Sequence, residues 1–282
     1  MQKVKIITDS SCDLDIDYLN EIGVEMSPLV TILEDGDFLD RVEITPGEFY
    51  KKLKNIKKLP TTSQSTPASF YKLFKEAIDN DMEVVCIAFS SKLSGTYQSA
   101  IIAKEMLNND ERVEVIDSLA ASVGQGLIVE KAAFMAREGK NKDEIINEVI
   151  RMRGKMEHII GVGSLDMLKL GGRISASQAV IGNLLSVKPI LHFVDGAIFP
   201  LDKTRGKKGL IKKLIQILEE KGEDIKSNRI GISYSEDLEF ARELENEIKE
   251  KLGIDNILIS EIGSVIGSHV GPSTIALFFI RK

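Results

Sequence analysis

Residues 82–107 read MEVVCIAFSSKLSGTYQSAIIAKEML, and this stretch passes from a strand pattern to a helix pattern through a turn rich in hydroxyls. Its first part is a nearly continuous apolar run, which is typical of a buried parallel strand. Its second part carries apolar residues at helical spacing. A strand that ends in serines and leads into a helix predicts a βαβ unit, and ligands of such units gather at the carboxyl ends of the strands.

The same alternation continues on both sides of this stretch. Apolar runs that end in Asp or Ser recur at residues 4–10 and 112–118. Helical apolar spacing recurs at residues 66–81 and 124–139. Strands and helices that alternate in this way predict a mainly parallel α/β lobe in the first half of the chain.

The second half has a different pattern. Asp195-Gly196 stands between two strand-like runs, and this pair favours a hairpin because both turn positions need a positive φ. Two helix-like segments then alternate with three further strand-like runs at residues 228–235, 256–263 and 273–282. Hairpins mixed with helices predict an α+β lobe with a mixed or antiparallel sheet.

The length of the chain, 282 residues, predicts two domains rather than one compact core. We place the boundary near residue 155, after the charged helix predicted at residues 141–155. The expected lobes are therefore residues 1–155, of α/β type, and residues 156–282, of α+β type.

Composition narrows the classes of function. The net charge of −6 disfavours a nucleic-acid surface, which normally carries a basic field. Cys12 and Cys86 have no paired spacing, so neither a disulfide framework nor a cysteine metal site is expected, and a reducing cytoplasm fits best. The amino terminus lacks the apolar core of a signal peptide and the length of a membrane span.

The motifs of several enzyme classes are absent from the sequence. It contains no GxxxxGK[ST] loop, no GxGxxG after the first strand, no HExxH and no GxSxG. His158 and His192 lie within strand-like text and are expected to be structural. With three histidines in all and no carboxylate at metal spacing, a zinc site is not expected.

Two hydroxyl-rich turns are the first candidates for a binding site. Ser94 and Gly95 precede a helix, where a hydroxyl and free backbone N–H groups attract an anion. Taken alone, however, Ser94 is more readily interpreted as an ordinary N-cap. Upstream, LPTTSQSTPASF (residues 59–70) is readable as a loop ending in an N-cap Thr66 before Pro67. That reading leaves Thr62 and Ser63 without an assigned role.

A glycine-rich segment and two arginines complete the set. GSVIGSHVGPST (residues 263–274) places His269 in a predicted loop, either bent around a ligand or simply exposed to solvent. Arg173 follows a double glycine and Arg205 precedes a helix. They could form a basic edge beside the site, or be ordinary solvated charges.

These segments together resemble the DegV family of fatty-acid-binding proteins, which includes the carrier subunit of bacterial fatty acid kinase. The resemblance spans essentially the whole chain. The matching segments are ITDSSCDL (7–14), LPTTSQSTPASF (59–70), SSKLSGTYQSA (90–100), VIDSLAASVGQGLIV (115–129), LDMLKLGGRIS (165–175), VKPILHFVDGAIFPLDKTRGKKG (187–209) and GSVIGSHVGPST (263–274). One departure is Ser65, where the family usually has proline, and we expect it to soften that loop.

The resemblance implies a cytoplasmic carrier with a DegV-like fold, no catalytic residue and no cofactor. A long-chain fatty acid would lie in an apolar tunnel between the lobes, where each buried methylene contributes about 0.8 kcal/mol. The carboxylate would be held by Thr62, Ser63, Ser94, the amide of Gly95 and the loop histidine His269. Arg173 and Arg205 match residues that face an ATP-dependent fatty acid kinase or the developing acyl phosphate.

Other interpretations stay open at this point. A hydrolase using Ser94 and His269 lacks a nameable third member of a triad beyond Asp9. A phosphotransferase lacks a nucleotide loop. An interaction module could hold a different amphiphile, and transient contact with a membrane is compatible with the sequence. Acyl length, the presence of a kinase and the oligomeric state do not follow from the residues.

Overall fold

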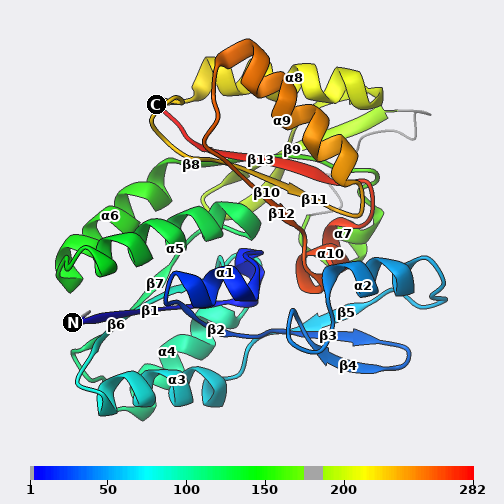
Figure 1. Ribbon diagram of the computed structural model, residues 1–282. Coiled ribbons are helices and arrows are strands. Elements are labelled where there is room, and N and C mark those ends of the chain that lie inside the picture. The colour runs from blue at the N-terminus through cyan, green and yellow to red at the C-terminus, as the bar shows by residue number, and fades with distance from the viewer. Residues whose placement is uncertain (1–2, 175–186) are drawn as a thin grey trace.

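The computed structural model describes residues 3–174 and 187–282 (Figure 1). Within them the strands form a four-stranded sheet, a six-stranded sheet and a small three-stranded sheet. Helices cover the two larger sheets. The mixed α/β architecture and the division into a parallel and a mixed sheet confirm the predicted fold class.

The four-stranded sheet is parallel throughout and occupies the first half of the chain. Alternate residues of one of its two inner strands face opposite sides of the sheet. Ile6 packs toward α1 and α5, whereas Ile7 packs with Phe70 and Phe74 of α3. The elements are β2 (Glu25–Ser27), β1 (Val4–Asp9), β6 (Glu83–Ala88) and β7 (Val113–Asp117), with α1 (Ile16–Glu21), α5 (Ser122–Arg137) and α6 (Lys142–Lys155) on one face and α3 (Pro67–Asp79) and α4 (Thr96–Met106) on the other.

The six-stranded sheet is mixed and belongs to the second half of the chain. Only β11 and β12 pair in parallel among its described neighbours; the other pairs are antiparallel. One face is covered by α8 (Gly206–Lys221) and α9 (Leu238–Leu252), and the other faces the first lobe (Figure 1). In spatial order the strands are β10 (Ala197–Arg205), β9 (Val187–Val194), β8 (Met156–Gly161), β13 (Ile275–Ile280), β11 (Ile230–Tyr234) and β12 (Ile257–Glu261).

The predicted hairpin joins β9 and β10. Asp195 and Gly196 have φ values of 48° and 82°, as a tight turn of this kind requires. The carbonyl of Gly196 accepts a hydrogen bond from Ser90 Oγ at 2.8 Å. The hairpin of the second lobe is therefore attached to the turn that follows β6 in the first.

The three-stranded antiparallel sheet was not predicted. It consists of β3 (Val30–Leu33), β4 (Gly36–Leu39) and β5 (Thr61–Ser63), and α2 (Pro46–Leu53) packs beside it. Residues 61–63 were expected in a turn. Pairing with β3 extends them, and such short polar strands leave almost no periodic signal in the sequence.

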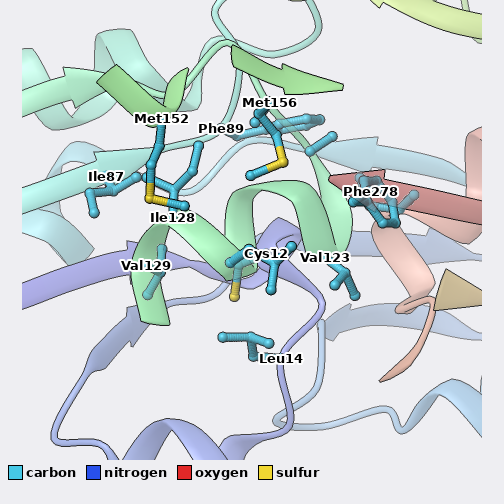
Figure 2. Packing of buried hydrophobic residues seen from close by; sticks show 14 of the residues in the cluster. Cys12, Leu14, Ile87, Phe89, Val123, Ile128, Val129, Met152, Met156 and Phe278 are labelled. Atoms are coloured by element: carbon cyan, nitrogen blue, oxygen red, sulfur yellow. The ribbon is translucent and has the colours of Figure 1, made fainter. Parts of the chain in front are cut away.

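The main hydrophobic core joins the two lobes through α5 (Figure 2). Cys12 and Leu14 of the first lobe and Phe278 of β13 belong to one buried cluster with Val123. Glycine makes the close approach of α5 to the second lobe possible, since a Cβ at Gly124 would lie 2.8 Å from Phe278 Cδ1. The lobes thus share a core, with the remaining short elements at their junction: η1 (Ser10–Cys12), α7 (Asp166–Leu170) and α10 (Ser264–Val270).

We propose residue 155 as the boundary between the lobes. Every strand of the parallel sheet precedes residue 118, and the first strand of the mixed sheet begins at Met156, directly after α6. Across the described residues, no helix combines the length and apolar character needed to cross a membrane.

Candidate functional site

A cavity of about 310 Å³ lies between the lobes. The segment from Phe89 to Gly95, which follows β6, forms one side of it, and strands of the mixed sheet form the other. Its position at the carboxyl end of a parallel strand agrees with the rule for such sheets. Its volume lies at the lower end of the roughly 300–1,000 Å³ usual for small-molecule sites.

Polar residues from several distant segments line one part of the cavity, which we call the polar end. Thr62 Oγ1 and His269 Nε2 are 2.8 Å apart and connect β5 with α10. All five residues predicted to hold a carboxylate lie in the lining. The polar end consists of Thr62, Ser63, Gln64, Ser94, Gly95, Arg173 and His269.

The start of α4 differs in detail from the simple capping interpretation. Gly95, not Ser94, is the N-cap residue, and it makes no side-chain cap. Ser94 Oγ instead accepts from the backbone N–H of Thr96 at 3.2 Å and lies 2.9 Å from Thr96 Oγ1. The hydroxyl of Ser94 is therefore held at the first turn of the helix, beside the cavity.

Gln64 is a site residue that the prediction missed. A Cβ at position 95 would lie 2.0 Å from Gln64 Oε1, so Gly95 leaves the space that the Gln64 side chain fills. Gln64 Nε2 donates to Ser99 Oγ at 2.7 Å. This fixes the Thr62–Gln64 segment against α4. The TTSQS run contained the signal, but the contact partner lies far away in the sequence.

His269 lies in the last turn of the short helix α10, which corrects its prediction as a loop histidine. Its segment resembled a loop because of its glycines. The structure gives them packing roles instead: a Cβ at Gly267 would lie 2.7 Å from Phe49 Cε1 of α2. Gly271, with a φ of 73°, then ends the helix.

The imidazole of His269 is neutral near pH 7. Burial, and to a smaller extent the nearby positive charge of Arg173, together lower its pKa to about 4. A neutral imidazole offers one donor and one acceptor. It can therefore make a hydrogen bond to an anion or a hydroxyl without adding a charge.

Arg173 brings a cation to the polar end. Its Nε donates to the backbone oxygen of Leu93 at 3.0 Å and one terminal nitrogen donates to that of Gly171 at 2.5 Å. Burial lowers the pKa of Arg173, but a guanidinium stays charged. Within residues 3–174 and 187–282 no carboxylate forms an ion pair with it, and none lines the cavity.

Arg205 lies elsewhere. It is exposed at the end of β10, just before α8, and does not line the cavity. The two arginines singled out in the sequence are thus not brought together in the cavity wall. A shared role toward a kinase stays a prediction.

Two buried aspartates, absent from the predicted site, anchor the amino end of α10. Asp13 Oδ1 accepts from the N–H of Gly263, and Asp40 Oδ1 accepts from the N–H of Ser264, both at 2.8 Å. Arg41 pairs with Asp13 at 3.2 Å. Burial raises the pKa of Asp13 to about 6, against the opposing effect of Arg41. These contacts position the helix that carries His269.

Asp9 has a supporting rather than a chemical position. Its carboxylate accepts from the N–H of Phe89 at 2.7 Å and so fixes the start of the turn that lines the cavity. Burial raises its pKa to about 6. Ser65, the departure from the family pattern, is buried and exchanges a hydrogen bond with the hydroxyl of Ser27.

The rest of the lining is mainly hydrophobic, and we call it the apolar wall. His158 lies within it, stacked on Phe193 with ring centroids 4.2 Å apart. Its Nε2 accepts from the N–H of Ala121 at 3.3 Å, and burial lowers its pKa to about 4. The main apolar side chains of this wall are Phe89, Ile160, Phe193, Ile198, Ile266, Ala276 and Phe278.

The geometry of the polar end differs from that of a hydrolytic triad. His269 contacts Thr62 and not Ser94. Its Nδ1 is buried without a hydrogen-bond partner in the described part of the chain, so no carboxylate orients the ring there. Across residues 3–174 and 187–282, no group of three or more His, Cys, Asp or Glu side chains could hold a metal ion.

Comparisons with known proteins agree on one family. A family model described as "Uncharacterised protein, DegV family" matches residues 3–282. A DegV domain-containing protein of Caldanaerobacter subterraneus subsp. tengcongensis is 38% identical over 282 residues, which is 100% of both chains.

Two solved structures share the fold over nearly their whole length. One, described as showing fatty acid binding of a DegV family protein from Thermus thermophilus, is 33% identical, with a TM-score of 0.91, and covers 99% of this chain and 100% of its own. A stearic acid-binding protein from Eubacterium ventriosum is 30% identical, with a TM-score of 0.87, and covers 99% and 98%.

Proposed function

The chain belongs to the DegV family, and on that premise we propose that it binds a long-chain fatty acid in the cavity between its lobes. The tail lies against the apolar wall and the carboxylate at the polar end. The protein acts as a carrier and makes or breaks no bond itself.

The observation that carries this proposal is the division of the cavity lining. One part is mainly apolar, and the other holds hydroxyls, a neutral histidine and the charge of Arg173, with no described carboxylate in the lining. An amphiphile with a negative head group fits such a lining. Its tail contributes most of the affinity, at about 0.8 kcal/mol for each buried methylene.

Within the polar end, Thr62, Ser94 and His269 are the proposed ligands of the carboxylate, with Ser63 and the amide of Gly95 beside them. Hydrogen bonds to an ionised acceptor are roughly twice as strong as neutral ones. Arg173 adds attraction at short range, although two of its nitrogens already bond to backbone oxygens. These groups orient the head while the tail supplies the binding energy.

A further part of the proposal is that the bound acid is presented to an ATP-dependent kinase, which forms the acyl phosphate. Arg173 and the exposed Arg205 are the residues proposed to face that partner. Charge reversal at Arg205, which is exposed and does not line the cavity, should lower acyl phosphate formation with the kinase while leaving fatty acid binding unchanged. The proposed setting is the cytoplasm, in line with the two buried free cysteines.

The experiment that tests fatty acid binding uses the delipidated full chain and two matched ligands. Titration calorimetry with stearic acid should give one tight site per chain. Methyl stearate keeps the tail but removes the charge, and should bind at least tenfold more weakly because the polar end is built for an anion. Failure of stearic acid to bind, or equal affinities of the two ligands, would contradict the proposal.

A further inference from the structure

One hydroxyl of the apolar wall is placed differently from the others. Ser233 of β11 lies beside Ala276 of β13, which in turn lies beside Ile160 of β8, and all three line the cavity. The preceding Ile232 packs into the opposite core, under α8 and α9. Because side chains alternate along a strand, Ser233 faces the cavity side of the sheet.

The other hydroxyls in this wall have partners within the protein. Ser122 Oγ donates to a carboxylate oxygen of Asp13, and Thr274 Oγ1 donates to the backbone oxygen of Val270 at 3.1 Å. Ser235, which follows the end of β11 and lies outside the lining, accepts from the N–H of Thr274 at 2.8 Å. Their hydrogen-bonding capacity is used inside the protein.

Ser233 Oγ, by contrast, has no hydrogen-bond partner among the described residues, although the residue is fully buried. Buried polar groups in folded proteins are nearly always paired, because a buried unpaired hydroxyl has lost its bonds to water without replacement. A plain hydrocarbon tail lying over Ser233 leaves that loss uncompensated. An oxygen on the tail at the same place compensates it.

We propose that the cavity selects a long-chain acid that carries a hydroxyl or keto oxygen on its tail, and that Ser233 binds this oxygen. The inference rests on the proposed binding of a fatty acid and specifies its class. A serine hydroxyl serves either group, since it donates to a keto oxygen and exchanges a bond with a hydroxyl. Ser233 would then be a specificity-determining residue rather than a source of overall affinity.

The test compares tails on the delipidated full chain by calorimetry. The ligands are stearic acid, its 9-, 10- and 12-hydroxy derivatives and the matching keto acids. Acids that carry the oxygen at one of these carbons should bind about three- to tenfold more tightly than stearic acid. This is the range expected for one net hydrogen bond. The hydroxy and keto series then distinguish which oxygen is preferred.

Variants assign the preference to Ser233. In Ser233→Ala the ratio between the preferred acid and stearic acid should fall to about one, while stearic acid itself binds at least as well as before. Ser233→Cys, which keeps the size and a weak donor, should retain only part of the preference. The control Ser227→Ala changes an exposed serine outside the lining and should leave the ratio unchanged.

Two outcomes overturn the inference. Equal binding of stearic acid and every oxygenated acid to the unmodified chain would mean that Ser233 is satisfied in another way. A preference that persists in Ser233→Ala would place the recognition elsewhere. If none of the acids binds, the proposed function fails as well, and this result is distinct from equal binding of all.

Discussion

The polar end and the apolar wall of the cavity are assembled in opposite ways. The polar end consists of one to three residues from each of four places: β5 and its end, the start of α4, the segment after α7 and the end of α10. The apolar wall comes largely from neighbouring strands of one sheet, where β-register alone places Ala276 beside Ile160 and Phe278 beside His158. A head-group contact therefore depends on a few exact placements, whereas contact with the tail is spread over many side chains.

This difference implies that changing one group at the polar end lowers fatty acid affinity more than changing one group in the apolar wall. Thr62→Val replaces a hydroxyl with a methyl of the same size and should weaken stearic acid binding about 10- to 100-fold, as expected for a lost hydrogen bond to a charge. Binding of methyl stearate should change little. Calorimetry with both ligands measures the contrast, and equal losses for both would break the comparison.

Titration of His269 offers a second, pH-dependent contrast. Its folded pKa is lowered to about 4 from 6.5, so between these values the folded state binds fewer protons than the unfolded state. Stability should therefore fall as the pH drops from about 6.5 to 4. This pH-dependent loss of stability, on the order of 1–3 kcal/mol, should be absent in His269→Gln.

Urea unfolding at a series of pH values checks this difference. His158 titrates in the same direction, whereas Asp9 and Asp13, with pKa values raised to about 6, favour the folded state at acid pH. The comparison must therefore be made between the variant and the unmodified chain at each pH. Parallel pH profiles for the two proteins would contradict a neutral His269.

Arg173 links the charge at the polar end to the protonation of His269. Arg173→Gln should raise the pKa of His269, because the guanidinium charge is one of the causes that lower it. It should also weaken stearic acid binding by about five- to tenfold. An NMR titration of the imidazole measures the pKa. If both the pKa of His269 and the affinity for stearic acid were unchanged, Arg173 would have no electrostatic role at the polar end.

The apolar wall should show the smallest single effect. Ile198→Val removes one methylene from the lining and should change stearic acid affinity by less than about fivefold, in line with roughly 0.8 kcal/mol per methylene. Shortening the acid by two carbons should have a larger effect than this substitution. A loss as large as that of Thr62→Val would mean that the tail is held at one point.

The sequence predicted the parts of the fold that rest on periodicity and turn chemistry. The parallel strands, the Asp195-Gly196 hairpin and the N-cap of α3 at Thr66 are where the patterns indicated. The small sheet and α10 were not predicted, and the reason is physical. Short polar strands and a glycine-rich helix gain their stability from distant partners such as β3 and Phe49.

The same limit applies to the site. Thr62 was identified because its segment holds more hydroxyls than capping requires, and His269 because of the glycines around it. Ser94 was readable as a cap, and the resemblance to the family grouped the three. Gln64 and Asp13 stood in the quoted motifs, but their partners Gly95 and Gly263 are set by tertiary packing. Ser233 carries no local signal, because its environment depends on the register of three strands.

The central claim is that the carboxylate of a fatty acid lies at the polar end and its tail against the apolar wall. A crystal structure of the chain with ω-bromostearic acid tests it most directly, because the anomalous signal of bromine locates the tail terminus. The carboxylate should lie within hydrogen-bond distance of Thr62, Ser94 and His269, with the bromine among the side chains of the apolar wall. A reversed orientation, or a ligand outside the cavity, would contradict the account.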